Sequence, residues 1–162
     1  MIMKWLIYTL NTVLLIVILT LFYIAFESKA EIPASIISGE EQLSPEDHIK
    51  EEDIHVYDDR VVIDIVNPYW ASFTDTNSMD PIIDEDANSI QIIPQNLEDV
   101  HVGDIISYES EYANGVIIHR VVFKGQDEQG IYYYLKGDNN VMRDPGRVRF
   151  DQLRRITVGI IY

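Results

Sequence analysis

Hydrophobic positions divide the chain into one continuous apolar segment and a longer region of alternating pattern. Residues 5–26 form a run of 22 residues without a charged side chain. As a helix, this run would be about 33 Å long, which is enough to cross the hydrocarbon core of a bilayer. Lys4 and the α-amino group precede the run, which favours an inside N-terminus. The pattern therefore predicts a single-pass anchor in the cell membrane over residues 1–30, with the remaining chain on the extracytoplasmic side.

A cleaved signal peptide is the alternative interpretation of this segment. Ser28-Lys29-Ala30 places small residues at positions −3 and −1 of a cut after Ala30. The apolar run, however, is longer than the h-region of about 7–15 residues in a usual signal peptide. A retained anchor is therefore favoured, and both interpretations send the rest of the chain across the membrane.

The next segment is predicted to be a tether, because residues 31–44 are small and polar and are interrupted by Pro33 and Gly39. Ser44 and Pro45, followed by acidic residues, predict the start of a short helix that ends near Glu52. We therefore expect a folded extracytoplasmic domain over residues 45–162, a length typical of one compact domain.

Beyond residue 52 the apolar residues alternate with a period of two, and β-branched residues are abundant. This pattern predicts strands at residues 60–66, 89–93, 104–110, 116–123, 131–135 and 156–161. Asn114-Gly115 lies between two of them and is a strong hairpin signal, and residues 124–130 predict a second hairpin loop. No long helical periodicity and no strand–helix alternation follow. The predicted fold class is therefore mainly β, an all-β domain behind one N-terminal transmembrane helix.

Composition narrows the classes of function. The chain carries 12 Lys and Arg against 27 Asp and Glu, a net charge of −15. Nucleic acid is therefore not an expected partner, because its binding needs basic side chains that displace counterions. Cysteine is absent, which excludes disulfides, thiolate metal sites and a cysteine nucleophile. None of the four histidines has the His-x-x-x-His spacing of a zinc-binding helix, so no metal ligands are predicted.

Two features of the predicted domain bear on contact with lipid. Basic residues concentrate in residues 112–162, which hold 8 bases and 5 acids, whereas residues 31–111 hold 2 bases and 21 acids. The C-terminal arginines either pair with acids of the same chain or contact anionic lipid; they are Arg143, Arg147, Arg149, Arg154 and Arg155. Trp70 and Phe73 either dip toward the membrane or pack in the core.

Four short segments carry the candidate chemistry. They are Thr76-Asn77-Ser78-Met79-Asp80-Pro81, Gly103-Asp104-Ile105-Ile106, His119-Arg120-Val121-Val122 and Lys136-Gly137-Asp138-Asn139-Asn140, with Asp144-Pro145-Gly146 shortly after. In this order and spacing, behind an N-terminal apolar segment, they resemble the type I signal peptidase family from about residue 74 to the C-terminus. The histidine directly before Arg-Val is similar to the endoplasmic-reticulum and archaeal branch, since the bacterial branch has lysine there.

The chemistry of these residue types agrees with the resemblance. A serine hydroxyl is a poor nucleophile until a neighbouring base removes its proton. A neutral imidazole held by a carboxylate does this near neutral pH. Ser78 is the candidate nucleophile and His119 the candidate base, the alternatives being a turn serine and a half-buried strand histidine. The resemblance favours Asp144 as the orienting carboxylate, with Asp138 structuring the neighbouring turn.

Two further residues are supporting candidates. The resemblance implies that the hydroxyl of Thr76 helps to form the oxyanion hole, and a buried threonine at a strand end is the alternative. Lys136 is expected to be a structural cation, although a desolvated lysine can also activate a serine. Asn77 stands where this branch usually has glycine, and asparagine tolerates left-handed backbone better than most residues.

The resemblance implies a membrane-bound serine endopeptidase that removes N-terminal signal peptides from exported preproteins, with small residues at −1 and −3. No cofactor is expected. The expected partners are the signal peptides of preproteins, the lipid membrane and the secretion translocon. Two other functions stay open: a related protease dedicated to one substrate, and a non-catalytic membrane-tethered β module that binds exported chains.

Overall fold

The computed structural model describes residues 5, 8, 11–20 and 42–162. The chain divides into two compact units, Met1–Ile32 and Pro33–Tyr162. In the first unit, residues 11–20 are helical. Among the described residues, no helix is both long and apolar enough to span a bilayer. The expected anchor over residues 1–30 and tether over residues 31–44 fall for the most part outside the described residues.

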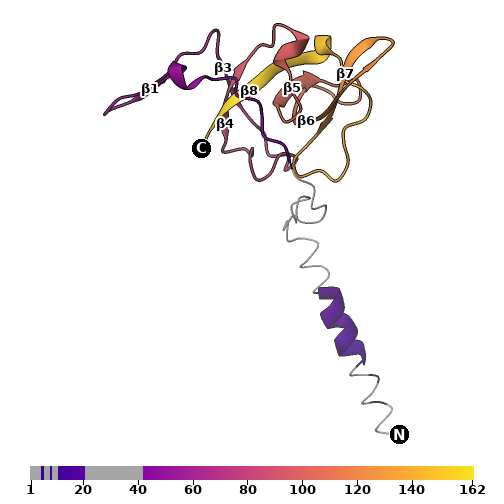
Figure 1. Ribbon diagram of the computed structural model, residues 1–162. Coiled ribbons are helices and arrows are strands. Elements are labelled where there is room, and N and C mark those ends of the chain that lie inside the picture. Colours follow the sequence, from indigo (N-terminus) through magenta and orange to yellow (C-terminus); the bar gives the residue numbers. More distant parts are fainter. Residues whose placement is uncertain (1–4, 6–7, 9–10, 21–41) are drawn as a thin grey trace. The chain divides into compact units, whose positions relative to one another are not determined.

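The second unit is built of antiparallel strands (Figure 1), which confirms the mainly β fold class. In residues 42–162, β1 pairs with β2, and six strands form a second sheet in the order β3-β4-β8-β5-β6-β7. The strands are β1 (Ile54–Val56), β2 (Val61–Ile63), β3 (Tyr69–Ser72), β4 (Asn88–Ile92), β5 (Ile105–Glu109), β6 (Val116–Asp127), β7 (Gly130–Lys136) and β8 (Leu153–Ile161). The 3₁₀ turns are η1 (Glu51–Asp53), η2 (Leu97–Asp99) and η3 (Phe150–Gln152).

The six-stranded sheet buries apolar side chains in two clusters. Ile105 and Ile106 are neighbours on β5 but enter different clusters, because successive side chains of a strand point to opposite faces. The smaller cluster contains Met79, Ile83, Ala87 and Ile105. The larger cluster contains Val100, Ile106, Tyr108, Val121, Tyr133, Leu135, Val148, Leu153 and Ile156. Both faces near β5 and β6 are therefore fixed by packing.

Both expected hairpins form, but the loop of the second is shorter than expected. Asn114-Gly115 lies between the antiparallel strands β5 and β6, and Gly115 has φ of +88°, which glycine adopts without strain. Residues 124–130 are not a loop, because β6 continues to Asp127 and pairs with β7. The turn is confined to residues 128–129, and Gly130, the first residue of β7, has φ of +103°.

Tertiary contacts explain why β6 continues past the expected end. Gly125 is a weak strand former, but a Cβ at this position would lie 2.6 Å from the Phe123 ring and 2.8 Å from the Tyr132 ring. The glycine thus lets two aromatic side chains pack over the strand. The amino group of Lys124 donates to the carbonyl oxygens of Leu97 and Val100. Neither contact can be read from local sequence pattern.

Residues 42–50, hereafter the strap, form neither helix nor strand, so the helix expected over residues 44–52 is wrong. Only η1 forms in this part of the chain, without a side-chain cap. The strap uses its backbone groups for contacts with the sheet instead of a helical ladder. The N–H of Glu46 donates to Asp104 Oδ1 at 3.0 Å, and the carbonyl of Leu43 accepts from Arg120 at 3.1 Å.

The folded domain begins before the expected start at Pro45. The side-chain amide of Gln42 donates to the carbonyl of Asp138 at 3.2 Å. The carbonyl oxygen of Ser44 passes 2.1 Å from the place where Gly103 would carry a Cβ. Gly103 also has φ of +107°, so a side chain at this position is excluded on two grounds.

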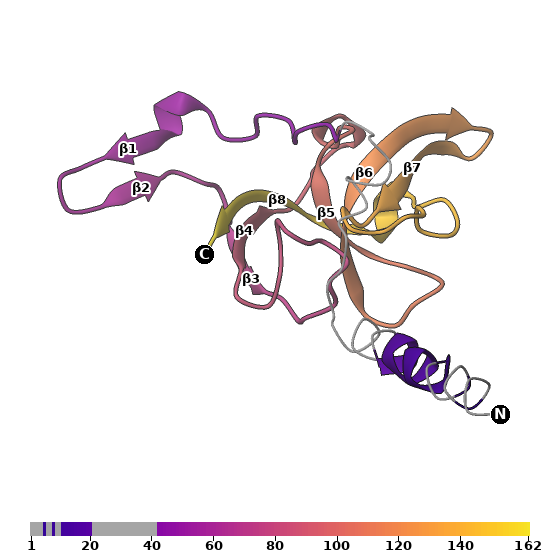
Figure 2. The same cartoon turned by 90° about the horizontal axis from the view of Figure 1, so that it is seen from below.

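The β1–β2 hairpin projects from the six-stranded sheet in both views (Figures 1 and 2). Its second strand, β2, covers only the first half of the strand that we expected over residues 60–66. The two aromatic residues of the next segment differ in exposure. Trp70 on β3 is 62% exposed, whereas Phe73 packs against the smaller cluster. Trp70 therefore lies on the surface of the domain, and Phe73 belongs to the core.

Candidate active site

β6 positions the candidate base against an aspartate. His119 lies opposite Ile106 of β5, and its side chain is 9% exposed. Its Nδ1 lies 2.6 Å from Asp144 Oδ2. Because a carboxylate only accepts hydrogen bonds, Nδ1 carries the hydrogen, and a neutral ring then has its lone pair on Nε2. This tautomer is the one that a general base for a serine requires.

A buried phenol holds the same carboxylate. Tyr108 of β5 is 1% exposed, and its hydroxyl donates to Asp144 Oδ2 at 2.7 Å. Burial, together with the hydrogen bond to Asp144, raises the pKa of Tyr108, so the phenol stays a donor. The backbone N–H of Asp144 donates to the carbonyl of Leu135 at 2.8 Å. Three contacts therefore fix the position of this aspartate.

Sequence analysis did not select Tyr108 as a site residue. Tyr108 is two residues from Ile106, the strand partner of His119, and therefore lies on the same face of β5. This position was the available signal that Tyr108 could belong to the site. A buried tyrosine hydroxyl needs an acceptor, but the sequence alone does not say which one.

The candidate nucleophile lies in the loop after β3. Asn77, directly before Ser78, has φ of +56°, the left-handed conformation that asparagine tolerates. Met79, directly after Ser78, is 2% exposed and packs in the smaller core cluster. The backbone on both sides of the serine is therefore constrained, one side by conformation and the other by packing.

The turn after β7 holds this loop from the other side. The backbone N–H of Asn139 donates to the carbonyl of Ser78 at 3.0 Å, and its side-chain amide donates to the carbonyl of Asn77 at 2.9 Å. A Cβ at Gly137 would lie 2.4 Å from the Ser78 carbonyl oxygen. The glycine therefore permits the close approach of the turn to the serine.

Strand register brings this turn to the part of β6 that carries the candidate base. Lys136, the half-buried last residue of β7, pairs with Arg120, the neighbour of His119. Within the described part of the chain, the Ser78 hydroxyl has a hydrogen bond with Thr76 Oγ1, at 3.1 Å, and none with His119. Catalytic hydrogen bonds are often long in substrate-free enzymes and tighten when substrate binds.

Asp138 makes a buried ion pair and does not contact the histidine. Both of its carboxylate oxygens accept from Arg120, at 2.8 and 2.6 Å, and the two side chains are 3% and 6% exposed. Arg120 also donates to the carbonyls of Gly103 and Leu43, at 2.8 and 3.1 Å. The structure thus places Asp144, rather than Asp138, against His119, and it joins Asp138 to the strand that carries His119.

Replacing Asp138 with asparagine should lower the free energy of unfolding by about 3–5 kcal/mol, because a buried guanidinium loses its counter-charge. Urea unfolding of the full-length protein, followed by far-UV circular dichroism, measures the change. The matched control is Asp127→Asn, which breaks a more exposed pair with Arg149 and should change stability much less. If the two variants lost the same free energy of unfolding, the buried Asp138–Arg120 pair would contribute no more to stability than the more exposed pair, and this prediction would be wrong.

The C-terminal arginines mostly pair within their own chain. Arg147 and Arg149 contact Asp127 at 2.6 and 2.7 Å, and Arg154 contacts Glu109 at 2.6 Å. The guanidinium of Arg143 lies 3.6 Å from the centre of the Tyr134 ring, and that of Arg155 lies 4.1 Å from the centre of the Tyr69 ring. Three of the five arginines thus pair with acids of the same chain, which was the first of the two interpretations of this basic group.

Comparison with known proteins gives no relative. No protein-family model, no curated protein and no solved structure matches the chain. What the site can do is therefore decided by its own residues and their geometry.

Proposed function

We propose that this chain is a membrane-bound serine endopeptidase that removes N-terminal signal peptides from exported preproteins. The observation that carries the proposal is the 2.6 Å contact between His119 Nδ1 and Asp144 Oδ2. A histidine oriented by a carboxylate is what a serine nucleophile needs near neutral pH. The order of serine, histidine and aspartate along the chain resembles the endoplasmic-reticulum and archaeal branch of the type I signal peptidase family.

The proposed reaction follows from the roles of three side chains. Ser78 Oγ attacks the carbonyl carbon of the scissile bond while His119 Nε2 takes the serine proton. The imidazolium is stabilised by Asp144, and its proton then passes to the leaving amine. Water, activated by the same histidine, hydrolyses the acyl-enzyme and regenerates the serine. These steps need no cofactor.

The oxyanion of the tetrahedral intermediate needs hydrogen-bond donors. We assign this role to the backbone N–H of Ser78 and the hydroxyl of Thr76, whose Oγ1 lies 3.1 Å from Ser78 Oγ. A donor aimed at the developing charge contributes about 3 kcal/mol to transition-state stabilisation. Rotation of the Thr76 hydroxyl away from Ser78 would make it available for this bond.

The outer strand of the sheet offers a place for an extended substrate. β3 ends the strand order of the six-stranded sheet and leads directly into the loop of Ser78. Free backbone groups on an edge strand can pair with a peptide. Trp70, 62% exposed on β3, suits the membrane interface. We therefore propose that a signal peptide pairs with this edge.

Cleavage of a preprotein by the purified full-length protein in detergent micelles tests the proposal. With alanine at positions −3 and −1, we expect a single cut after position −1, identified by mass spectrometry of both products. Phenylalanine at −1 should lower kcat/KM by at least about 100-fold, because a pocket for a methyl group rejects a larger side chain.

Three other outcomes would change the proposed function. Failure to cut any exported preprotein would favour a non-catalytic β module that binds exported chains. Cleavage of one preprotein out of a broad panel would favour a dedicated protease. Equal cleavage of substrates with alanine and with phenylalanine at −1 would contradict the assigned specificity.

A further inference from the structure

A second cluster of chemically active side chains shares no residue with the proposed triad. His48 of the strap, His101 and Asp104 each place one ligand atom within 4.8 Å of the others. His48 Nε2 lies 2.9 Å from Asp104 Oδ1, and His101 Nδ1 lies 3.9 Å from Asp104 Oδ2. We propose that these three side chains bind a divalent transition-metal ion, with Zn²⁺ the best match, at a site independent of the proposed peptidase activity.

The ligand types fit zinc. Two imidazole nitrogens and one carboxylate oxygen form a common three-ligand zinc set that leaves one position for water. Tetrahedral ligands with bonds of about 2.0–2.1 Å are about 3.3 Å apart. The observed separations, 2.9 Å from His48 Nε2 to Asp104 Oδ1 and 3.9 Å from His101 Nδ1 to Asp104 Oδ2, involve different carboxylate oxygens. Side-chain rotations would therefore have to bring one of these oxygens within ligand distance of both rings.

An unsatisfied nitrogen points to a missing ligand. His101 Nδ1 is buried and has no hydrogen-bond partner among the described residues, although the rest of its side chain is 44% exposed. At 3.9 Å, its separation from Asp104 Oδ2 is too long for a hydrogen bond. A buried polar atom without a partner is unfavourable, and a metal ion would use the lone pair of this nitrogen.

Asp104 is prepared to act as an anionic ligand. Its side chain is fully buried, and its oxygens accept from the backbone N–H groups of Glu46 and His101, at 3.0 and 2.8 Å. Donors of this kind orient a metal-binding carboxylate from the outer shell.

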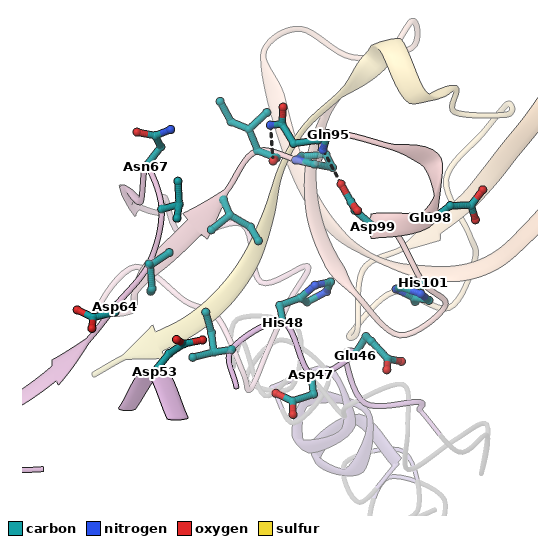
Figure 3. A pocket seen from close by; sticks show the side chains of 16 residues that line it. Glu46, Asp47, His48, Asp53, Asp64, Asn67, Gln95, Glu98, Asp99 and His101 are labelled. Carbon is teal, nitrogen blue, oxygen red and sulfur yellow. Dashed lines mark hydrogen bonds between the residues drawn. The ribbon is translucent and has the colours of Figure 1, made fainter. Parts of the chain in front are cut away.

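The cluster opens onto an acidic cavity of about 720 Å³ (Figure 3). His48 and His101 line it together, with ring centres 6.2 Å apart. Six carboxylates are among the groups that line the cavity, beside apolar side chains, and they would raise the local concentration of cations; they belong to Glu46, Asp47, Asp53, Asp64, Glu98 and Asp99. A cation therefore has both an access route and an attractive potential.

A bound ion would join the strap to the sheet. His48 and Asp104 are 56 residues apart in sequence, so the ion would close a long loop. Because binding requires the folded arrangement, it would also raise the thermal unfolding midpoint. The expected effect is on stability and on attachment of the strap, not on the peptide-bond chemistry.

Titration of the full-length protein in detergent micelles with Zn²⁺, in competition with a chromophoric chelator, tests the site. The protein is stripped of metal beforehand. We expect one ion per chain, a higher unfolding midpoint, and the visible bands of tetrahedral Co²⁺ when cobalt replaces zinc. His101→Ala should weaken binding by at least about 100-fold, since loss of even an outer-shell partner costs 10–100-fold. The exposed edge of this ring makes His101→Ala tolerable to the fold.

The matched control is His55→Ala, which removes a histidine whose Nε2 pairs with Asp64, an acid that also lines the cavity. This variant should bind zinc as the wild type does. The proposal would be overturned by absence of zinc binding in the wild type, by equal binding in His101→Ala, or by Ca²⁺ competing at the same concentration. Competition by Ca²⁺ would indicate a diffuse acidic surface, because calcium prefers oxygen ligands.

Discussion

Replacing Ser78 with alanine is expected to reduce signal-peptide cleavage by about 10⁶-fold, to the background of the assay. The change removes the attacking oxygen and leaves the loop in place, because Met79 beside it stays buried in the core. His119→Ala should cause the same loss by removing the base. The double variant should be no slower than either single variant, because residues that act as a unit are not additive. The measurement is kcat/KM on a preprotein, with circular dichroism to verify folding.

Two control variants make this result specific. Ser44→Ala changes an exposed serine outside β3 and outside the Ser78 loop and should retain wild-type activity. Lys136→Ala should stay within about tenfold of the wild type, as expected for a side chain without a proton-transfer role. A folded Lys136→Ala protein that is inactive, beside an active His119→Ala protein, would make lysine the base. Wild-type cleavage by Ser78→Ala would end the proposed function.

Asp144→Asn is expected to lower kcat by about 10⁴-fold with little change in folding. An asparagine amide can donate to Nδ1 of His119, which places the ring hydrogen on Nε2 and removes the lone pair that the serine needs. The 2.6 Å contact would then remain in an unproductive form. Steady-state kinetics on a preprotein measures the loss, and circular dichroism measures the folding.

Tyr108→Phe is the comparison that separates proton chemistry from positioning. It removes a donor to Asp144 Oδ2 but leaves the histidine tautomer intact, so its loss should be far smaller than that of Asp144→Asn. Equal losses in the two variants would show that the carboxylate acts by position alone. The assigned role of Asp144 in selecting the tautomer would then be wrong.

Local patterns were enough to predict much of the fold and one contact of the candidate site. The period-two pattern identified the strands of the β5–β6 hairpin, and Asn114-Gly115 located its turn. The pairing of His119 with an aspartate after β7 followed from chemistry, because an imidazole on an apolar face needs a polar partner. The resemblance favoured Asp144, and the coordinates place that residue at the ring.

The remaining features depend on contacts between distant segments. The strap replaces a helix because Glu46 finds an acceptor in Asp104, far along the chain. Tyr108 reaches Asp144 across two strands and a loop. The histidines of the proposed metal site are not spaced as a sequence motif, and only the fold brings them together. Contacts of this kind between distant segments produce no periodic pattern in a single sequence.

The contacts of the strap also limit how much of the N-terminal segment proteolysis can remove without disturbing the folded domain. A cut after Ala30 would leave Gln42, Leu43 and Ser44 on the released fragment. Trimming to Pro45 would take the Leu43 carbonyl away from the buried Arg120 guanidinium, which it accepts from at 3.1 Å. A recombinant fragment of the domain that keeps these contacts should therefore start no later than residue 42.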